Sequence, residues 1–150
     1  MTPTRETVAQ ALATLFDLNP ILTQAGFQKF GRRLVNWDQI DPADKPALFL
    51  VNYTENHSRP YVTGPDAVTM GFMLVVYDDV RDPAAIPSQR ANDLLDAIDA
   101  VLASVTSPMT GQITLGGVVQ HVWIEGEAQT SPGDLDGQTV ITYPIRALCP

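Results

Sequence analysis

The sequence predicts a single α+β domain with two main helices packed on one face of a mostly antiparallel mixed sheet of about five strands. Strands outnumber helices and follow one another in the order α-β-β-β-α-β-β, which leaves too few helices for a doubly wound fold. The chain has 150 residues, of which 45% are hydrophobic. A chain of this length and composition can form one hydrophobic core but is too short for two independent ones. We therefore treat residues 1–150 as one domain.

Two segments have the apolar spacing of amphipathic helices. The first covers about residues 3–18. Thr2-Pro3 suits a helix start, and Asn19-Pro20 suits its end. The second helix covers about residues 87–105, where apolar residues recur at steps of three and four. These residues are Ala91, Leu94, Leu95, Ile98, Val101, Leu102 and Val105.

The expected strands are separated by segments rich in turn-forming residues. Residues 54–66 and 127–137 are polar and rich in glycine or proline, so we expect a long exposed loop or hairpin tip in the first and a turn in the second. Loops of this length in a compact domain are usually functional or disordered. The five expected strands are 27–37, 47–53, 67–77, 118–126 and 138–148, with a short extended piece at 113–115.

The charge excludes nucleic acid as the default partner. The net charge is −8 and the calculated pI is near 4.4, which disfavours a surface built to neutralise phosphates. Residues 1–75 hold 7 acids and 6 bases, a net charge of −1, whereas residues 76–150 hold 10 acids and 3 bases, a net charge of −7. Neither a signal peptide nor a membrane-spanning run is indicated. We expect a cytosolic chain without membrane contact.

No residue pattern points to catalysis, a cofactor or a metal. The two histidines, His57 and His121, lie far apart in sequence and Cys149 is the sole thiol, so a zinc site lacks ligands. No serine stands in a nucleophile-elbow pattern. The acidic stripe Asp93, Asp96 and Asp99 has the spacing of a solvated helix face. We expect a protein that is not an enzyme.

Several features favour assembly instead. Long loops on a compact sheet are available for contacts, and exposed strand edges offer a way to self-associate. Aromatic residues fall at or near strand ends or on edge-like segments, where they suit either a subunit contact or ordinary core packing. These residues are Trp37, Trp123, Tyr53, Tyr61, Tyr77 and Tyr143.

The element order and a series of local phrases resemble the tail terminator (tail completion, head–tail joining) proteins of long-tailed bacteriophages. The phrases occupy residues 33–37, 44–50, 92–98, 114–119, 133–138 and 143–145, and together they span about residues 5–147. The resemblance implies a structural virion protein without an active site. It implies a hexameric ring that caps the tail tube, ends its polymerisation and presents the surface on which the head docks.

The resemblance also implies partners and a location. The partners are further copies of the chain, the tail tube protein and a head completion or neck protein. The location is the tail or neck of the virion, reached by assembly in the host cytoplasm. DNA would pass through the ring without specific binding, which agrees with an acidic surface because like charges repel. The alternatives are another neck or head-completion component and a non-viral α+β binding module.

Two sets of residues are candidates for contacts. Four of the nine bases lie between residues 29 and 45, and we hypothesise that they pair with the acidic stripe of a neighbouring subunit, because a ring needs two different complementary surfaces. The alternative is that these bases are solvated. The bases are Lys29, Arg32, Arg33 and Lys45. The candidate contacts to tube or neck are Glu55, His57, Arg59 and Tyr61 in the first loop and Asp134 and Asp136 in the second.

Overall fold

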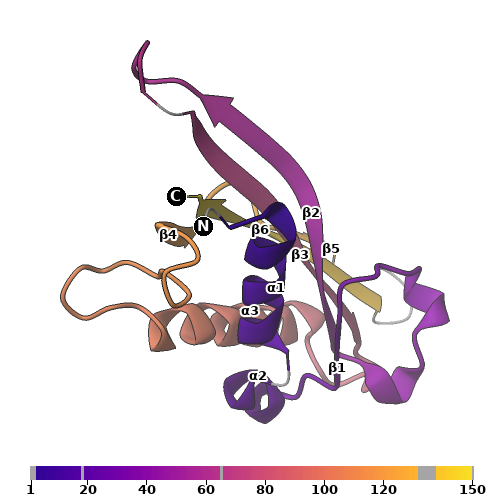
Figure 1. Ribbon diagram of the computed structural model, residues 1–150. Helices are drawn as coiled ribbons and strands as arrows, with labels where there is room; N and C mark the ends of the chain where they lie inside the picture. The colour runs from indigo at the N-terminus through magenta and orange to yellow at the C-terminus, as the bar shows by residue number, and fades with distance from the viewer. Residues whose placement is uncertain (1–2, 18, 65, 132–137, 150) are drawn as a thin grey trace.

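The computed structural model describes residues 3–17, 19–64, 66–131 and 138–149. It confirms a mixed α+β fold, in which a curled sheet follows the strand order β1-β2-β3-β6-β4 and β5 also pairs with β6 (Figure 1). The β1–β2 pair is parallel and the other pairs are antiparallel. The strands are β1 (Lys29–Gly31), β2 (Ala47–Ser58), β3 (Ala67–Asp79), β4 (His121–Ile124), β5 (Gln129–Ser131) and β6 (Gln138–Leu148).

Two long helices and one short helix accompany the sheet: α1 (Arg5–Phe16), α2 (Pro20–Ala25) and α3 (Pro87–Ser104). Thr4 caps α1 by accepting a hydrogen bond from the Thr7 amide, so the cap lies two residues beyond the expected Thr2. Asn19-Pro20 does not simply end a helix. Asn19 caps α2, and Pro20 occupies its first turn, where a missing N–H costs nothing. None of the helices in the described ranges is long and apolar enough to cross a membrane.

The largest correction concerns the expected loop at 54–66. Residues 54–58 continue β2, and they pair with β3 as far as Ser58 opposite Ala67. The described residues 59–64 form the tip of the hairpin that β2 and β3 make, which is one of the two expected forms. The polar residues that indicate a loop lie on the second half of β2. This half is largely exposed to solvent, since the rest of the protein covers only the first half of the strand.

Two other expected strands are shorter than the sequence indicates. The segment 27–37 forms a strand only over β1, and 118–126 forms one only over β4. The short extended piece expected at 113–115 is not part of the sheet. Part of 127–137 is the strand β5, and the rest, residues 132–137, lies outside the described residues. Strands 67–77 and 138–148 are present, and β6 has the expected bounds.

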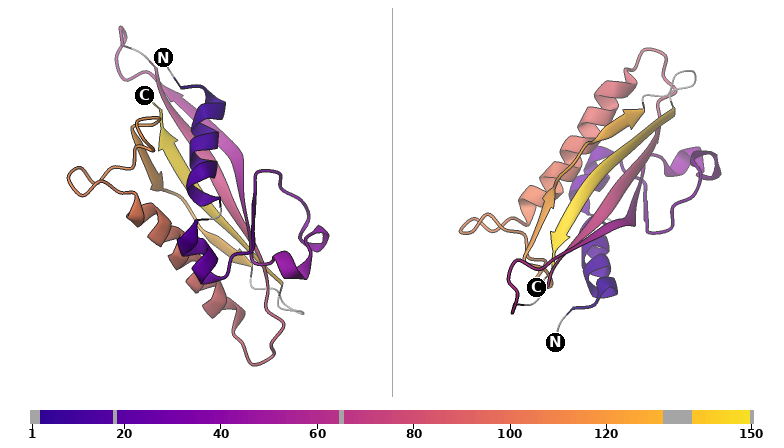
Figure 2. Two further views of the ribbon diagram at one scale, coloured as in Figure 1. Left: turned by 60° about the horizontal axis from the view of Figure 1, so that its bottom comes forward. Right: turned by 90° about the horizontal axis from the view of Figure 1, so that it is seen from above.

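The two faces of the sheet belong to separate apolar clusters. Leu48, Phe72 and Ile145 share one cluster with the buried residues of α1 and α3. The alternate strand residues Phe49, Val75 and Tyr77 form a smaller cluster with Ile40. A segment of irregular structure, residues 32–46 with the 3₁₀ turns η1 (Trp37–Gln39) and η2 (Pro42–Asp44), covers this second cluster. It lies away from α3 in both views of Figure 2.

Specific hydrogen bonds hold the covering segment on the sheet. The Trp37 indole Nε1 donates to the Asp78 carbonyl at 3.0 Å, and the Tyr77 hydroxyl donates to the Val35 carbonyl at 2.7 Å. Each pairs a large aromatic body with a satisfied polar group. Trp37 and Tyr77 therefore belong to the fold, which resolves the open choice between core packing and subunit contact for these two aromatic residues.

A β-bulge changes the direction of the β2–β3 hairpin. Asn52 pairs with Phe72 and Thr54 with Gly71, so Tyr53 is an extra residue with no partner in β3. An extra residue on one strand bends it and increases its twist. Beyond the bulge the hairpin passes the N-terminal end of α1 and projects past the sheet (Figure 1). We call residues 54–64 and 66–69 the arm, and residues 59–64 its tip.

Candidate functional site

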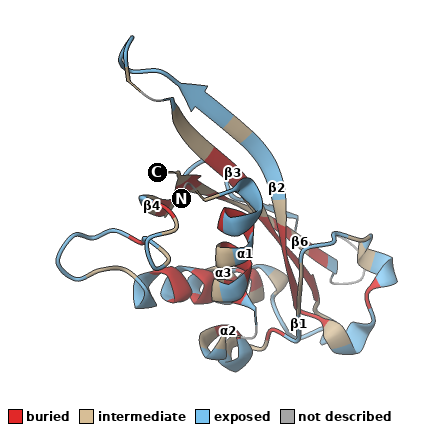
Figure 3. Ribbon diagram, viewed as in Figure 1, coloured by how far each residue is buried: buried red, intermediate tan, exposed pale blue. Residues whose placement is uncertain are grey.

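The arm and its base expose large hydrophobic side chains, whose contact with water contributes nothing to the stability of a monomer. Tyr61 and Val62 at the tip are 74% and 91% exposed, and Tyr53 at the bulge is 68% exposed. Figure 3 shows the outer part of the arm as almost continuously exposed. Apolar side chains that gather on a protruding element commonly mark an interaction site. Tyr61, expected from the sequence as a contact residue, is thus placed where a partner can reach it.

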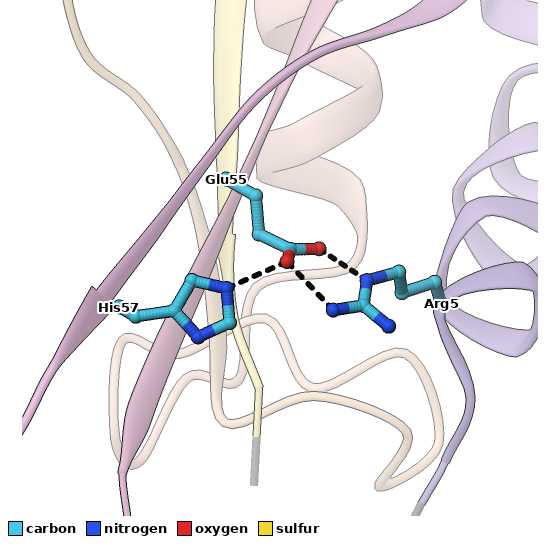
Figure 4. Close-up of polar contacts among 3 residues, drawn as sticks. All are labelled: Arg5, Glu55 and His57. Atoms are coloured by element: carbon cyan, nitrogen blue, oxygen red, sulfur yellow. Dashed lines mark hydrogen bonds and ion pairs between the residues drawn. The ribbon is translucent and has the colours of Figure 1, made fainter.

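A charged cluster joins the arm to α1 (Figure 4). The Arg5 guanidinium donates to both carboxylate oxygens of Glu55, at 2.5 and 2.8 Å. The His57 Nε2 lies 2.7 Å from Glu55 Oε2. The hydrogen bonds from Arg5 and then from His57 lower the pKa of Glu55 to about 2. Glu55 and His57, expected as free contact residues in a loop, are therefore engaged with each other and with Arg5.

We expect this cluster to make the attachment of the arm sensitive to acid. Because the pKa of Glu55 is lower in the folded chain than its ordinary value of 4.5, its contribution is fully present above pH 4.5 and is lost as the pH falls toward 2. Unfolding experiments on the wild type and Glu55→Gln should therefore show a difference at pH 6 that shrinks over this interval. A difference that stays constant down to pH 2 would contradict this role. Salt should reduce the difference at pH 6, since the group is exposed.

A cleft of about 390 Å³ opens beside the base of the arm. Its floor is formed by β3 and β6 and includes Met73 and Pro144, which face each other across the two strands. Tyr53 and Thr54 line one side, and the β4–β5 connection lines the other. The cleft takes up part of the sheet face that the 32–46 segment leaves open. It was not expected from the sequence, because it arises from the curl of the sheet.

The β4–β5 connection is held close to the floor of the cleft. At Gly126, where φ is +121°, a Cβ would lie 3.0 Å from the Pro144 side chain, so glycine suits both the backbone conformation and the close approach. On either side of Gly126, Glu125 and Glu127 give the cleft an acidic rim. Glu125 pairs with Arg146 at 3.0 Å. Glu127 has no ion-pair partner among the described residues.

The four clustered bases do not share one environment. Lys45 is buried, with its Nζ 3.1 Å from the centre of the Trp37 ring, and burial lowers its pKa. Arg32 pairs with Glu6 of α1 at 2.7 Å. Lys29 and Arg33 are exposed and have no acidic partner in the described part of the chain. Only these two of the four are free for a neighbour without breaking a contact within the chain.

Most other bases are also neutralised internally. Arg59 pairs with Asp66 at 2.8 Å, and Arg81 pairs with Asp79 at 2.6 Å. The Arg90 Nε lies 3.4 Å from the buried carboxylate of Asp78. Every arginine except Arg33 therefore has an acidic partner, whereas acids such as Glu127 are left over. The surface consequently offers few free cations to a phosphate backbone.

The acidic stripe lies exposed on α3, as its spacing predicts. Asp93 and Asp96 have no partner among the described residues, whereas Asp99 accepts a hydrogen bond from the Tyr143 hydroxyl at 2.7 Å. Burial and this hydrogen bond raise the pKa of Tyr143. Asp134 and Asp136 lie outside the described residues. Within the described ranges, no group of three or more histidine, cysteine or acidic side chains could hold a metal ion.

Comparison with known proteins finds a similar fold in a solved structure. No protein-family model matches the chain, and no curated protein sequence matches it. Among solved structures, a chain from the virion of a native gene transfer agent particle is similar, with a TM-score of 0.52. The match covers 95% of this chain and 95% of that chain, at 12% sequence identity. The similarity is thus one of fold, and it extends over nearly the whole of both chains.

Proposed function

We propose that this chain is a structural protein of a phage-like virion and that it acts as a tail terminator. In this role it caps the tail tube as a hexameric ring, as the family resemblance implies, ends tube polymerisation and presents a surface for the head. The observation that carries the proposal is the fold shared with a virion chain over 95% of both lengths. The terminator role adds to this the resemblance of the element order and local phrases to that family.

The surface chemistry supports a role in assembly. A ring requires two different patches, so that each copy contacts its neighbour head to tail. The free bases Lys29 and Arg33 follow α2, and the free acids Asp93 and Asp96 lie on α3. We propose that these two pairs form the complementary patches of opposite charge. With few free cations, a ring of such subunits would let DNA pass without holding it, and the proposal needs no catalytic residue.

The proposal is tested by capping. The purified chain is mixed with the self-assembling tail tube protein encoded in the same genome, and tubes are imaged by electron microscopy. We expect shorter tubes with a ring at one end. Rings that bind only a purified head-completion protein would instead favour another neck component. A chain that stays monomeric and leaves the tubes unchanged would favour a binding module outside the virion and would overturn the proposal.

Charge reversal tests the proposed subunit contact. We expect Lys29→Glu with Arg33→Glu to abolish ring formation, because both free bases would then face like charges on the next copy. Adding Asp93→Lys and Asp96→Lys should restore rings, as measured by light scattering and electron microscopy. If the first pair of substitutions leaves the ring intact, these bases are simply solvated.

A further inference from the structure

The tip of the arm is an apolar element without a cover. Tyr61 and Val62 protrude from the end of a hairpin and are among the most exposed large hydrophobic residues of the chain. The base of the same arm borders the open cleft, which Tyr53 and Thr54 line. The protein thus carries an apolar protrusion and, at a separate place, a cleft with an apolar floor and a charged rim.

The tip cannot fill the cleft of its own chain. The tip starts at Arg59, five residue steps beyond Thr54, which at about 3.3 Å per step is roughly 16 Å. Figure 1 shows the arm projecting past the rest of the sheet. An occupant must therefore come from another molecule.

Charge favours the tip of a second copy over the apolar protrusion around Met109. The cleft is lined by two carboxylates, Glu125 and Glu127, and one cation, Arg146, which pairs with Glu125, so Glu127 is left without a partner among the described residues. Arg59 lies two residues before Tyr61, and its side chain is 61% exposed even while paired with Asp66. The other protrusion, around the 94% exposed Met109, has no charged residue between 106 and 120. Of these two protrusions, the tip is the one that brings a cation to the rim of the cleft.

We propose that the tip of one copy inserts Tyr61 and Val62 into the cleft of the next copy, with Arg59 facing Glu127. The apolar side chains would cover Met73 and Pro144 on the floor, which the monomer leaves half-exposed. A protrusion that fits a hollow elsewhere on the same surface gives a head-to-tail contact that repeats from copy to copy. The inference rests on the proposed function only for closure of this series into a ring.

Cysteine cross-linking tests the contact in the full chain. In a Cys149→Ala background, Val62→Cys on the tip is combined with Gln129→Cys at the cleft, and the assembled protein is treated with a short bis-maleimide. We expect a ladder of covalent multimers. Val62→Cys alone can give at most dimers. The control pair, Val62→Cys with Asn92→Cys on the exposed side of α3, should give no ladder.

Self-association measured by sedimentation gives an independent test. Tyr61→Ala with Val62→Ala should weaken it at least about tenfold, as expected for an aromatic anchor in a pocket. Met109→Ala, which removes an equally exposed apolar side chain, should leave it unchanged. Arg59→Glu and Glu127→Arg should each weaken association, and the double variant should recover it. Unchanged thermal unfolding would verify that every variant folds.

The outcomes separate this inference from the proposed function. Rings without a ladder overturn the tip-in-cleft contact and leave the terminator proposal standing. A ladder in chains that never cap tubes supports the contact and counts against the terminator proposal. A ladder from the control pair as well, or the absence of both ring and ladder, overturns the contact.

Discussion

Replacing Phe72 by alanine should destabilise the protein by about 3–5 kcal/mol, the usual cost of truncating a buried phenylalanine. Phe72 is 1% exposed and lies on β3, the strand between β2 and β6. Its side chain belongs to the cluster that joins the sheet to α1 and α3. The loss would therefore weaken the contact between both helices and the sheet. Urea unfolding followed by circular dichroism measures the change.

The neighbouring residue provides a matched control for this prediction. Met73 points to the opposite face, lines the cleft and is only partly buried. Met73→Ala should therefore cost less than about 2 kcal/mol, because less apolar surface is lost from the interior. Equal losses for the two substitutions would contradict the assignment of the helix-covered face as the main core.

Replacing Gly71 by alanine should cost about 1–3 kcal/mol, the range found when extra atoms are forced into a packed site. A Cβ at Gly71 would overlap the Thr54 Oγ1, which is held opposite it next to the Tyr53 bulge. The two strands would have to separate where the arm begins. Thermal unfolding measures the stability, and cross-linking of the tip reports whether the arm keeps its direction.

A second substitution shows whether this overlap is the cause. In the Gly71→Ala background, Thr54→Ala removes the hydroxyl, and the Thr54 Cβ lies an ordinary 3.5 Å from the new methyl group. We expect most of the lost stability to return. Gly31→Ala is the matched control, because a Cβ there meets Phe49 at an ordinary 3.4 Å. If Thr54→Ala restores nothing, the cost lies in the bulge itself.

The buried elements could be predicted from the sequence because their signal is local. The α3 helix was expected at 87–105 and is found at Pro87–Ser104, since apolar residues at steps of three and four allow no other element. The β6 strand was expected with its observed bounds. Both elements bury one or both faces, so their patterns carry the strongest periodicity.

The sequence indicates a loop or a hairpin tip at 54–66 but not the strand residues 54–58, because the rest of the chain barely covers them. Residues 54–58 are polar, and a polar run next to Pro60 and Gly64 is typical of a loop. They form a strand because β3 extends opposite them and supplies hydrogen-bond partners. The pairing partner, β3, follows the tip in the sequence, so the polar residues of 54–58 do not themselves indicate the pairing. The same reasoning applies to the cleft, whose two walls come from β2 and from the β4–β5 connection.

The charged residues also show which properties are readable from the sequence and which require the tertiary structure. The sequence alone established an acidic, cysteine-poor α+β chain whose bases concentrate between residues 29 and 45, because composition and spacing are readable without coordinates. Only the tertiary structure decided which bases are free. It places Lys45 on Trp37 and pairs Arg32 with Glu6, leaving Lys29 and Arg33 without an acidic partner in the described chain. An ion pair depends on where two distant side chains meet in space, and no local pattern encodes that distance.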